Sequence, residues 1–129
     1  MRERTAIDAG LANYIKTSIV PVKLVIWIGD SRKRVREFPD RPRARAGFEL
    51  WAVQQGYDPS DWKPMSLVGP GVHEIRVHGD GEYRVIYIAR FEEAIYVLHA
   101  FEKKTRRTSR LDLDLARHRF RVLISERTR

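Results

Sequence analysis

The stretch His73–Phe101, HEIRVHGDGEYRVIYIARFEEAIYVLHAF, is the most informative part of the sequence about the fold. Its first six residues alternate between polar and apolar side chains, as in a strand with one buried face. Gly79-Asp80-Gly81 then predicts a hairpin turn whose glycines adopt positive φ angles. Two further β-rich runs follow, separated by a second turn at Glu92-Glu93. The stretch therefore predicts a three-stranded antiparallel meander.

Upstream of the meander, residues 23–28 predict one more strand, because they are β-branched and aromatic. A short basic helix is expected over about residues 31–38, with Asp30 or Ser31 as its cap. Its packing residues are Val35 and Phe38.

A second helix follows, with an apolar stripe at spacings of three and four and with Gly56 as its C-terminal stop. The stripe comprises Ala44, Phe48, Trp51, Ala52 and Gln55. Residues 57–71 hold three prolines, at positions 59, 64 and 70, and are expected to form a loop without regular structure.

The C-terminal part predicts a last helix that begins at a Ser109-x-x-Asp112 capping motif. Its stripe is Leu113, Ala116, Phe120, Leu123 and Ile124. The elements together predict an α+β fold: a small curved antiparallel sheet, made of the N-terminal strand and the meander, with two N-terminal helices and a C-terminal helix packed on one face. We expect residues 23–129 to form a single domain and residues 1–22 to be an N-terminal extension.

The composition is strongly basic. Among 129 residues, Lys and Arg number 25 and Asp and Glu number 17, which gives a formal net charge of +8. Ten basic and only four acidic side chains lie in residues 102–129. Such a surface attracts polyanions, of which nucleic acid is the commonest inside cells. Cysteine is absent, which excludes a disulfide framework and suits a reducing cytosol. The longest apolar run, residues 24–28, is far too short to span a membrane.

Several enzyme classes are disfavoured by the motifs. The four histidines, at positions 73, 78, 99 and 118, have no metal-ligand spacing. The chain also lacks a glycine-rich phosphate loop and a nucleophile elbow. We therefore expect no metal site and no cofactor.

Arg76 and Arg84 lie on consecutive strands of the meander. A three-residue turn places the two side chains opposite each other on one face, whereas a two-residue turn places them on opposite faces. On one face, their mutual repulsion would be relieved by a bound phosphate. Alternatively, each arginine is solvated or pairs with Glu74 or Glu82.

Other side chains could join such a site. His99 on the last strand is a candidate proton shuttle or a satisfied strand histidine. Where that strand ends, a basic run could bind RNA or be only solvated; it comprises Lys103, Lys104, Arg106 and Arg107. Trp62 is next to Lys63, so it could stack on RNA bases beside that positive charge. Alternatively, Trp62 is buried and fills part of the core. A cationic cleft of this kind suits attack by an RNA 2′-hydroxyl on its neighbouring phosphate.

A family resemblance rests on five separated motifs in order. They are WIGDSRKRVREFP at 27–39, DWKPM at 61–65, GVHEIR at 71–76, YRVIY at 83–87 and YVLHAFEKKT at 96–105. Together they resemble the phage-derived branch of the RelE/HigB-like toxins, in the RelE/ParE superfamily of type II toxin–antitoxin systems. The resemblance spans about residues 23–124 and implies the fold described above.

The resemblance implies a metal-independent mRNA interferase that cuts translated mRNA on the ribosome. Arg76, Arg84 and either Lys103 or Lys104 match the basic positions of the family pattern. His99 is the nearest candidate for the histidine of the HigB branch. Glu74 stands where RelE has a lysine, and a C-terminal catalytic tyrosine has no evident equivalent, so Glu74, His99 or neither serves as general base. Lys63, Lys104, Arg106 and Arg107 are the expected RNA-binding residues.

The resemblance also implies partners: a cognate antitoxin, typically a helix-turn-helix protein, then mRNA and the ribosome, and operator DNA only through the antitoxin. It implies a cytoplasmic protein without a membrane partner. Two other functions stay open. One is a ParE-like, non-catalytic inhibitor of DNA gyrase, and the other is an inactive nucleic-acid-binding relic.

Overall fold

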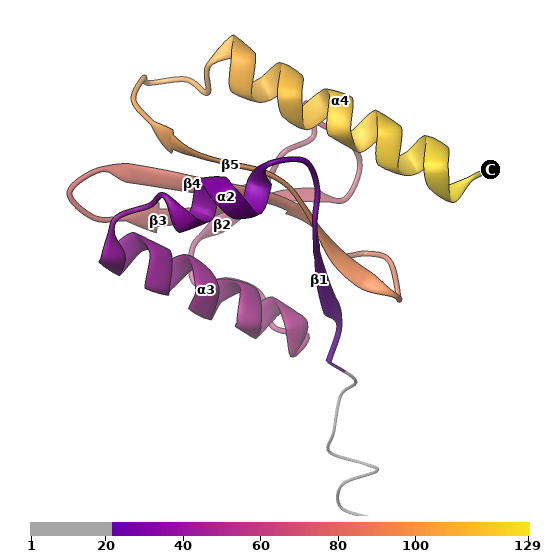
Figure 1. The fold of residues 1–129 in the computed structure, drawn as a ribbon, viewed down its shortest axis with the longest axis horizontal. Helices are drawn as coiled ribbons and strands as arrows, with labels where there is room; N and C mark the ends of the chain where they lie inside the picture. Colours follow the sequence, from indigo (N-terminus) through magenta and orange to yellow (C-terminus); the bar gives the residue numbers. More distant parts are fainter. Residues whose placement is uncertain (1–21) are drawn as a thin grey trace, which may run out of the picture.

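The computed structural model describes residues 22–129 (Figure 1). The expected N-terminal extension, residues 1–22, lies outside the described residues except for Val22. The described part is an α+β fold with three helices, as the sequence predicted, and its one sheet has five strands where four were expected.

The sheet has the strand order β1-β5-β4-β3-β2. Its strands are β1 (Leu24–Trp27), β2 (Trp62–Pro64), β3 (Val72–His78), β4 (Glu82–Ile88) and β5 (Ala94–Lys103). The predicted meander is β3, β4 and β5, paired antiparallel. β1 pairs with β5 in parallel, so the sheet is mixed rather than purely antiparallel.

β2 corrects the expectation that residues 57–71 have no regular structure. It pairs antiparallel with β3 and forms one edge of the sheet. A proline is tolerated in an edge strand because its missing N–H can face away from the partner. Pro64 therefore ends a short strand here without breaking the sheet.

The β3–β4 turn spans residues 79–81, since His78 pairs with Glu82. Positive φ was expected at its glycines and is absent there; among the described residues it occurs at Gly29, Gly56 and Gly71. The space beside Gly81 is limited instead by the ends of two side chains. A Cβ at this position would lie 2.9 Å from Glu102 Oε2 and 3.0 Å from the Tyr83 hydroxyl.

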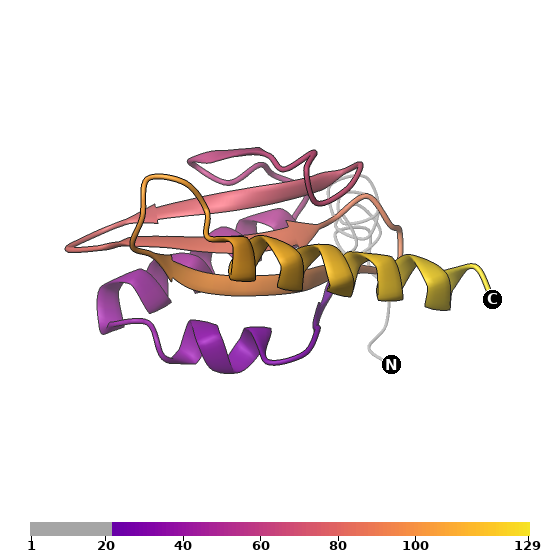
Figure 2. The ribbon, with the colours of Figure 1, turned by 90° about the horizontal axis from the view of Figure 1, so that it is seen from above.

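The helices are α2 (Ser31–Arg36), α3 (Asp40–Gln54) and α4 (Arg110–Arg127). The expectation that all helices pack on one face is wrong: α2 and α3 cover one face of the sheet and α4 lies on the other (Figures 1 and 2). Both faces carry apolar side chains, and each needs a cover. We call them the α2–α3 face and the α4 face.

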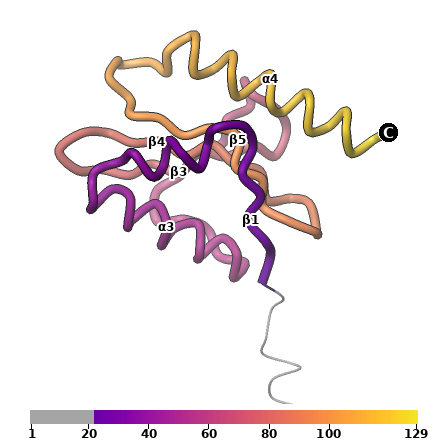
Figure 3. Tube along the Cα trace, in the orientation of Figure 1, coloured from indigo at the N-terminus to yellow at the C-terminus, as the bar shows by residue number. Residues whose placement is uncertain are grey.

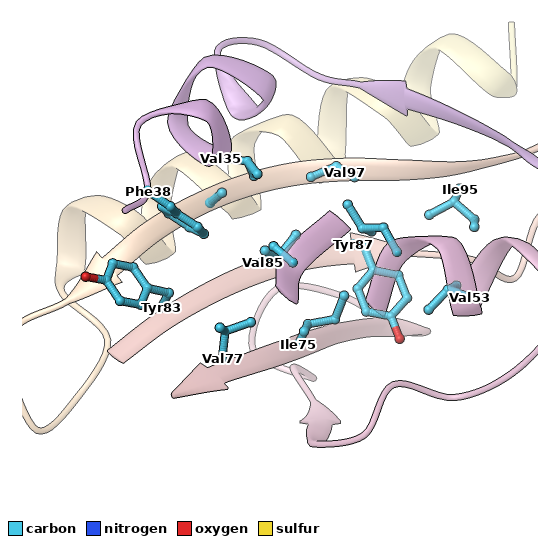
Figure 4. Packing of buried hydrophobic residues seen from close by; sticks show 13 residues of the cluster. Val35, Phe38, Val53, Ile75, Val77, Tyr83, Val85, Tyr87, Ile95 and Val97 are labelled. Carbon is cyan, nitrogen blue, oxygen red and sulfur yellow. The ribbon is translucent and has the colours of Figure 1, made fainter. Parts of the chain in front are cut away.

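The α2–α3 face carries one continuous cluster of buried apolar side chains (Figure 4). From the sheet it includes Ile75, Val77, Val85 and Val97, all with at most 1% of their surface exposed. The predicted packing residues of α2, Val35 and Phe38, join it. The chain turns directly from β1 into α2, as the trace in Figure 3 shows.

The predicted stripe of α3 is wrong. Phe48 and Trp51 are 51% and 54% exposed. The buried positions are instead Pro42, Ala46, Glu49, Leu50 and Val53. Apolar residues lie on several sides of this helix, and packing against the sheet selected the smaller ones. Gly56 ends the helix as expected, with φ of +93°.

The predicted start of α4 is confirmed, because the Asp112 N–H donates to the Ser109 hydroxyl. Its predicted stripe packs on the sheet. At α2 the N-cap is Asp30, but its side chain makes no cap hydrogen bond. The Asp30 carboxylate instead accepts from Arg34 and, across the fold, from Arg119 on α4.

Candidate cationic site

The pairing of β3 with β4 places Arg76 directly opposite Arg84. Directly paired residues share a face of the sheet, so both arginines lie on the α4 face. The next residue in the row, on β5, is Phe101, which belongs to the core under α4. Of the two turn lengths that the sequence left open between β3 and β4, the structure therefore has the three-residue turn.

Two more cations flank this pair on the same face. Lys63 of β2 pairs with Glu74, and Lys103 of β5 pairs with Glu82. The α4 face thus carries one cation from each of four neighbouring strands, beyond the part that α4 covers. We call Lys63, Arg76, Arg84 and Lys103 the cationic cluster.

Glu74 lies within the cationic cluster and is 2% exposed. Its burial raises the pKa of the carboxyl group, and the nearby cations oppose this rise, Arg84 most strongly. Glu74 Oε1 lies 3.7 Å from Arg84 Nε, which is ion-pair distance but too long for a hydrogen bond. Its second oxygen, Oε2, is buried with no hydrogen-bond partner among the described residues.

Arg84 is held inside the sheet and is 3% exposed. Its Nη1 donates to Glu82 Oε1 at 3.1 Å and to the Tyr83 carbonyl at 3.0 Å. Arg84 therefore has internal carboxylate partners, one of the alternatives that the sequence left open.

Arg76 differs from its cross-strand neighbour. It is half-buried, and it forms no ion pair within residues 22–129. Its Nε is buried without a hydrogen-bond partner in the same part of the chain. Arg76 therefore keeps its charge available for an external anion, whereas Arg84 does not.

His78 is a residue that the sequence analysis did not assign to the site. It is two residues from Arg76 on the same face, and its ring bridges two carboxylates: Nε2 lies 2.6 Å from Asp61 Oδ2 and Nδ1 lies 2.8 Å from Glu82 Oε1. These hydrogen bonds raise the pKa of His78, the one to Asp61 most. Because His78 is two residues from Arg76 on one strand, the sequence indicated that both side chains lie on the same face. Its partner Asp61 lies in residues 57–71, which were expected to be a loop, so this contact could not be predicted.

His99 lies outside the exposed part of the site. It has no exposed surface, and its Nε2 lies 2.7 Å from Asp112 Oδ1 at the start of α4. Burial lowers the pKa of His99, and the hydrogen bond to Asp112 opposes this. This hydrogen bond connects β5 to α4, so His99 holds the helix against the sheet.

The remaining predicted RNA-binding residues lie where β5 ends. Lys104, Arg106 and Arg107 are exposed in the segment between β5 and α4. Trp62 and Lys63 are adjacent in β2, so their side chains point to opposite faces. Trp62 stacks on His73 with ring centroids 4.3 Å apart, and it does not form a stacking surface beside Lys63.

The family described as phage derived protein Gp49-like (DUF891) matches residues 33–121, more than half of the chain. The chain belongs to the Gp49-like family. This family is toxin-like and related to the RelE/HigB type, so the resemblance noted in the sequence is confirmed at that level. A search of curated proteins finds no match.

No helix within residues 22–129 has the length and apolar character needed to cross a bilayer. In the same part of the chain, no three potential metal-ligating side chains are grouped as a metal site.

Proposed function

We propose that this Gp49-like protein is the toxin of a type II toxin–antitoxin pair and that it is an endoribonuclease acting on translated mRNA. The observation that carries the proposal is the cationic cluster: Arg76 and Arg84 face each other, flanked by Lys63 and Lys103, around the buried carboxylate of Glu74. Cations converging from several strands suit a phosphodiester that gains negative charge in its transition state.

The proposed reaction needs no nucleophile from the protein. The ribose 2′-oxygen attacks the adjacent phosphorus, the bond from phosphorus to the 5′-oxygen breaks, and the products are a 2′,3′-cyclic phosphate and a 5′-hydroxyl. In this proposal Glu74 takes the proton of the 2′-hydroxyl through its unpartnered Oε2, which is buried in the free protein and has to become accessible when RNA binds. His78, which is half-exposed and has a raised pKa, returns a proton to the leaving 5′-oxygen after one of its ring N–H groups leaves its carboxylate partner, Asp61 or Glu82.

The cations divide into two roles in this proposal. Arg76, Lys63 and Lys103 contact the scissile phosphate, because they are at least partly exposed. Arg84 is a positioning residue that holds Glu74 and Glu82. Lys104, Arg106 and Arg107 bind the RNA backbone beyond the cleavage point. His99 was expected near the chemistry and is here assigned to the attachment of α4.

The partners follow from this function. We propose a cognate antitoxin, of the helix-turn-helix type, that neutralises the toxin in the cytoplasm and brings it to operator DNA. Translated mRNA on the ribosome is the proposed substrate. Co-expression of the antitoxin should restore growth to cells that express the toxin.

The sharpest test replaces Arg76, since this side chain has no internal ion pair to disrupt. With Arg76→Ala, mRNA cleavage mapped by primer extension should fall at least about 100-fold, as when one transition-state donor is removed. The matched control is Arg121→Ala, an exposed arginine on α4 that should cut at the normal rate. Equal cleavage by both variants would refute the proposed site.

A second function is favoured by one observation. Arg84 is buried and paired with Glu74 and Glu82, which suits a protein that binds RNA without cutting it. In that case the protein would retard RNA in a gel, and primer extension would find no new ends. A gyrase inhibitor would instead induce a DNA-damage response without transcript cleavage.

A further inference from the structure

A cavity of about 350 Å³ lies on the α2–α3 face, where the C-terminal end of α3 meets the start of β3 and the end of β4. This volume is near the lower end of the range of small-molecule sites, about 300–1,000 Å³. Tyr87 of β4 and Val53 of α3 line the cavity (Figure 4), together with His73 of β3. His73 and Glu74 are consecutive in β3, so their side chains point to opposite faces. The cavity therefore lies on the other side of the sheet from the cationic cluster.

The hydroxyl group of Tyr87 has no well-formed hydrogen bond in the part of the chain that the structure describes. Tyr87 is 2% exposed, and its hydroxyl lies 3.5 Å from His73 Nδ1, at the limit of hydrogen bonding. Burial raises the pKa of Tyr87, so the group stays a neutral phenol that can donate or accept. A buried hydroxyl without a good partner is unfavourable. A ligand atom in the cavity would supply that partner.

Aromatic side chains form part of the cavity wall. The ring of His73 stacks on Trp62 with centroids 4.3 Å apart, and the Tyr87 ring lies perpendicular to it at 5.7 Å. These contacts hold the histidine ring in place. Tyr57, in the loop that follows α3, also lines the cavity and is 70% exposed. Aromatic rings at a cavity favour a ligand with a planar ring, which can stack on them.

Two cations line the cavity, and the fold holds both of them there. The Lys23 ammonium donates to the Ala89 carbonyl at 2.6 Å, which leaves its other N–H groups for a ligand. Arg90 packs against Gly71, where a Cβ would lie 2.6 Å from Arg90 Cδ. Neither cation has a carboxylate partner within residues 22–129. Both charges are therefore available to an anion.

The charge of the cavity favours one kind of anion. Among the described residues that line it, Asp58 is the only acidic one, against the two cations. A phosphate monoester carries about −1.5 to −2 charges at neutral pH, whereas a carboxylate, or a phosphodiester inside an RNA chain, carries a single charge. Two cations therefore match a terminal phosphate best. Together with the aromatic wall, they indicate a planar base that carries a terminal phosphate.

We propose that this cavity binds one nucleotide through its base and a terminal phosphate. The base stacks on His73 and Tyr57 and bonds to the Tyr87 hydroxyl, and the phosphate binds Lys23 and Arg90. Such a nucleotide is either a free mononucleotide or the phosphorylated end of an RNA chain. The inference goes beyond the proposed ribonuclease function and does not depend on it, because no residue of this cavity belongs to the cationic cluster.

The test titrates the full chain with each of the four ribonucleoside 5′-monophosphates by calorimetry. At least one of them should bind with a Kd below about 1 mM, and its nucleoside and inorganic phosphate should each bind at least about tenfold more weakly. A hexanucleotide with 2′-O-methyl groups, which lacks the nucleophile for cleavage, is titrated with and without a 5′-phosphate. Tighter binding of the free nucleotide assigns the cavity to mononucleotides, and tighter binding of the phosphorylated hexanucleotide assigns it to RNA ends.

Variants on the two faces of the sheet separate this proposal from the ribonuclease. Arg90→Ala should weaken nucleotide binding at least about tenfold and leave mRNA cleavage unchanged. Arg76→Ala is the matched control, which should bind the nucleotide as the wild type does, whether or not it cleaves RNA. Tyr87→Phe removes only the hydroxyl and should weaken binding at least about threefold. Thermal unfolding of each variant checks that it folds.

Several outcomes would overturn the proposal. One is the absence of binding by every mononucleotide and by the phosphorylated hexanucleotide up to about 5 mM. Undiminished binding to folded Arg90→Ala would place the ligand elsewhere on the molecule. Inorganic phosphate as tight as the nucleotides would refute recognition of the base. Equally tight binding of 4-hydroxybenzoate would assign the cavity to aromatic carboxylates instead.

Discussion

The same strands supply both faces of the sheet, but the side chains of the two faces have different roles. On the α2–α3 face, side chains such as Ile75 and Val85 are completely buried under two helices. On the α4 face, one helix covers only part of the surface, and the rest holds the cationic cluster with Glu74, Glu82 and His78. Consecutive residues of β3 serve the two faces alternately. Neighbouring residues of one strand can therefore contribute separately, one to stability and the next to the proposed chemistry.

The largest expected effect is on the α2–α3 face. Ile75→Ala should lower the free energy of unfolding by about 2–5 kcal/mol, because it leaves a cavity in a fully buried core. Urea denaturation measures this. The neighbouring Arg76→Ala should change the unfolding free energy by less than about 1 kcal/mol. Similar losses for both variants would contradict the division between the two faces.

Glu74→Gln should separate activity from stability. RNA cleavage should fall about 100-fold or more, since the proposed base is lost. Because burial raises the pKa of Glu74, its deprotonation in the folded protein is unfavourable, so the wild type should lose unfolding free energy relative to Glu74→Gln as the pH rises above 4.5. Over the same rise in pH, wild-type cleavage should increase. A pH profile of both quantities tests this, and cleavage by Glu74→Gln at the wild-type rate would exclude Glu74 as base.

Asp30 links the two faces, because its carboxylate accepts from Arg34 of α2 and from Arg119 of α4. These partners, Arg34 first, lower the pKa of Asp30 to about 2. A lowered folded-state pKa stabilises the fold above the ordinary value of 3.8 and ceases to do so as the pH falls toward 2. Asp30→Asn should therefore cost about 1 kcal/mol at pH 7, given the partial exposure of the group. Urea titrations should show a smaller difference at pH 3, and an unchanged difference would argue against the ion pairs.

The smallest expected effect is at Trp51, which the sequence placed in the core and the structure leaves exposed. Trp51→Ala should change the unfolding free energy by less than about 0.5 kcal/mol. Leu50→Ala, at the adjacent buried position, is the control and should cost about 2–5 kcal/mol. A larger loss of unfolding free energy for Trp51→Ala than for Leu50→Ala would instead support the apolar stripe expected from the sequence.

The amino-acid sequence is enough to predict the local elements that depend on short-range chemistry. Alternation in residues 73–78 and the glycine turn defined the hairpin, and the Ser109 motif placed the start of α4. It also supplied the residue types of the cationic cluster, although two registers stayed open for Arg76 and Arg84. These features depend on neighbours within a few residues, so the pattern of the chain is sufficient to predict them.

Features that depend on distant partners are set by the tertiary structure. It selected Leu50 rather than Trp51 for the core, paired β1 in parallel with β5, and placed α4 on the opposite face from α2 and α3. It also buried His99 against Asp112 and brought Asp61 to His78. Each of these outcomes depends on which surfaces remain to be covered once the sheet has formed, and a linear pattern does not contain that information.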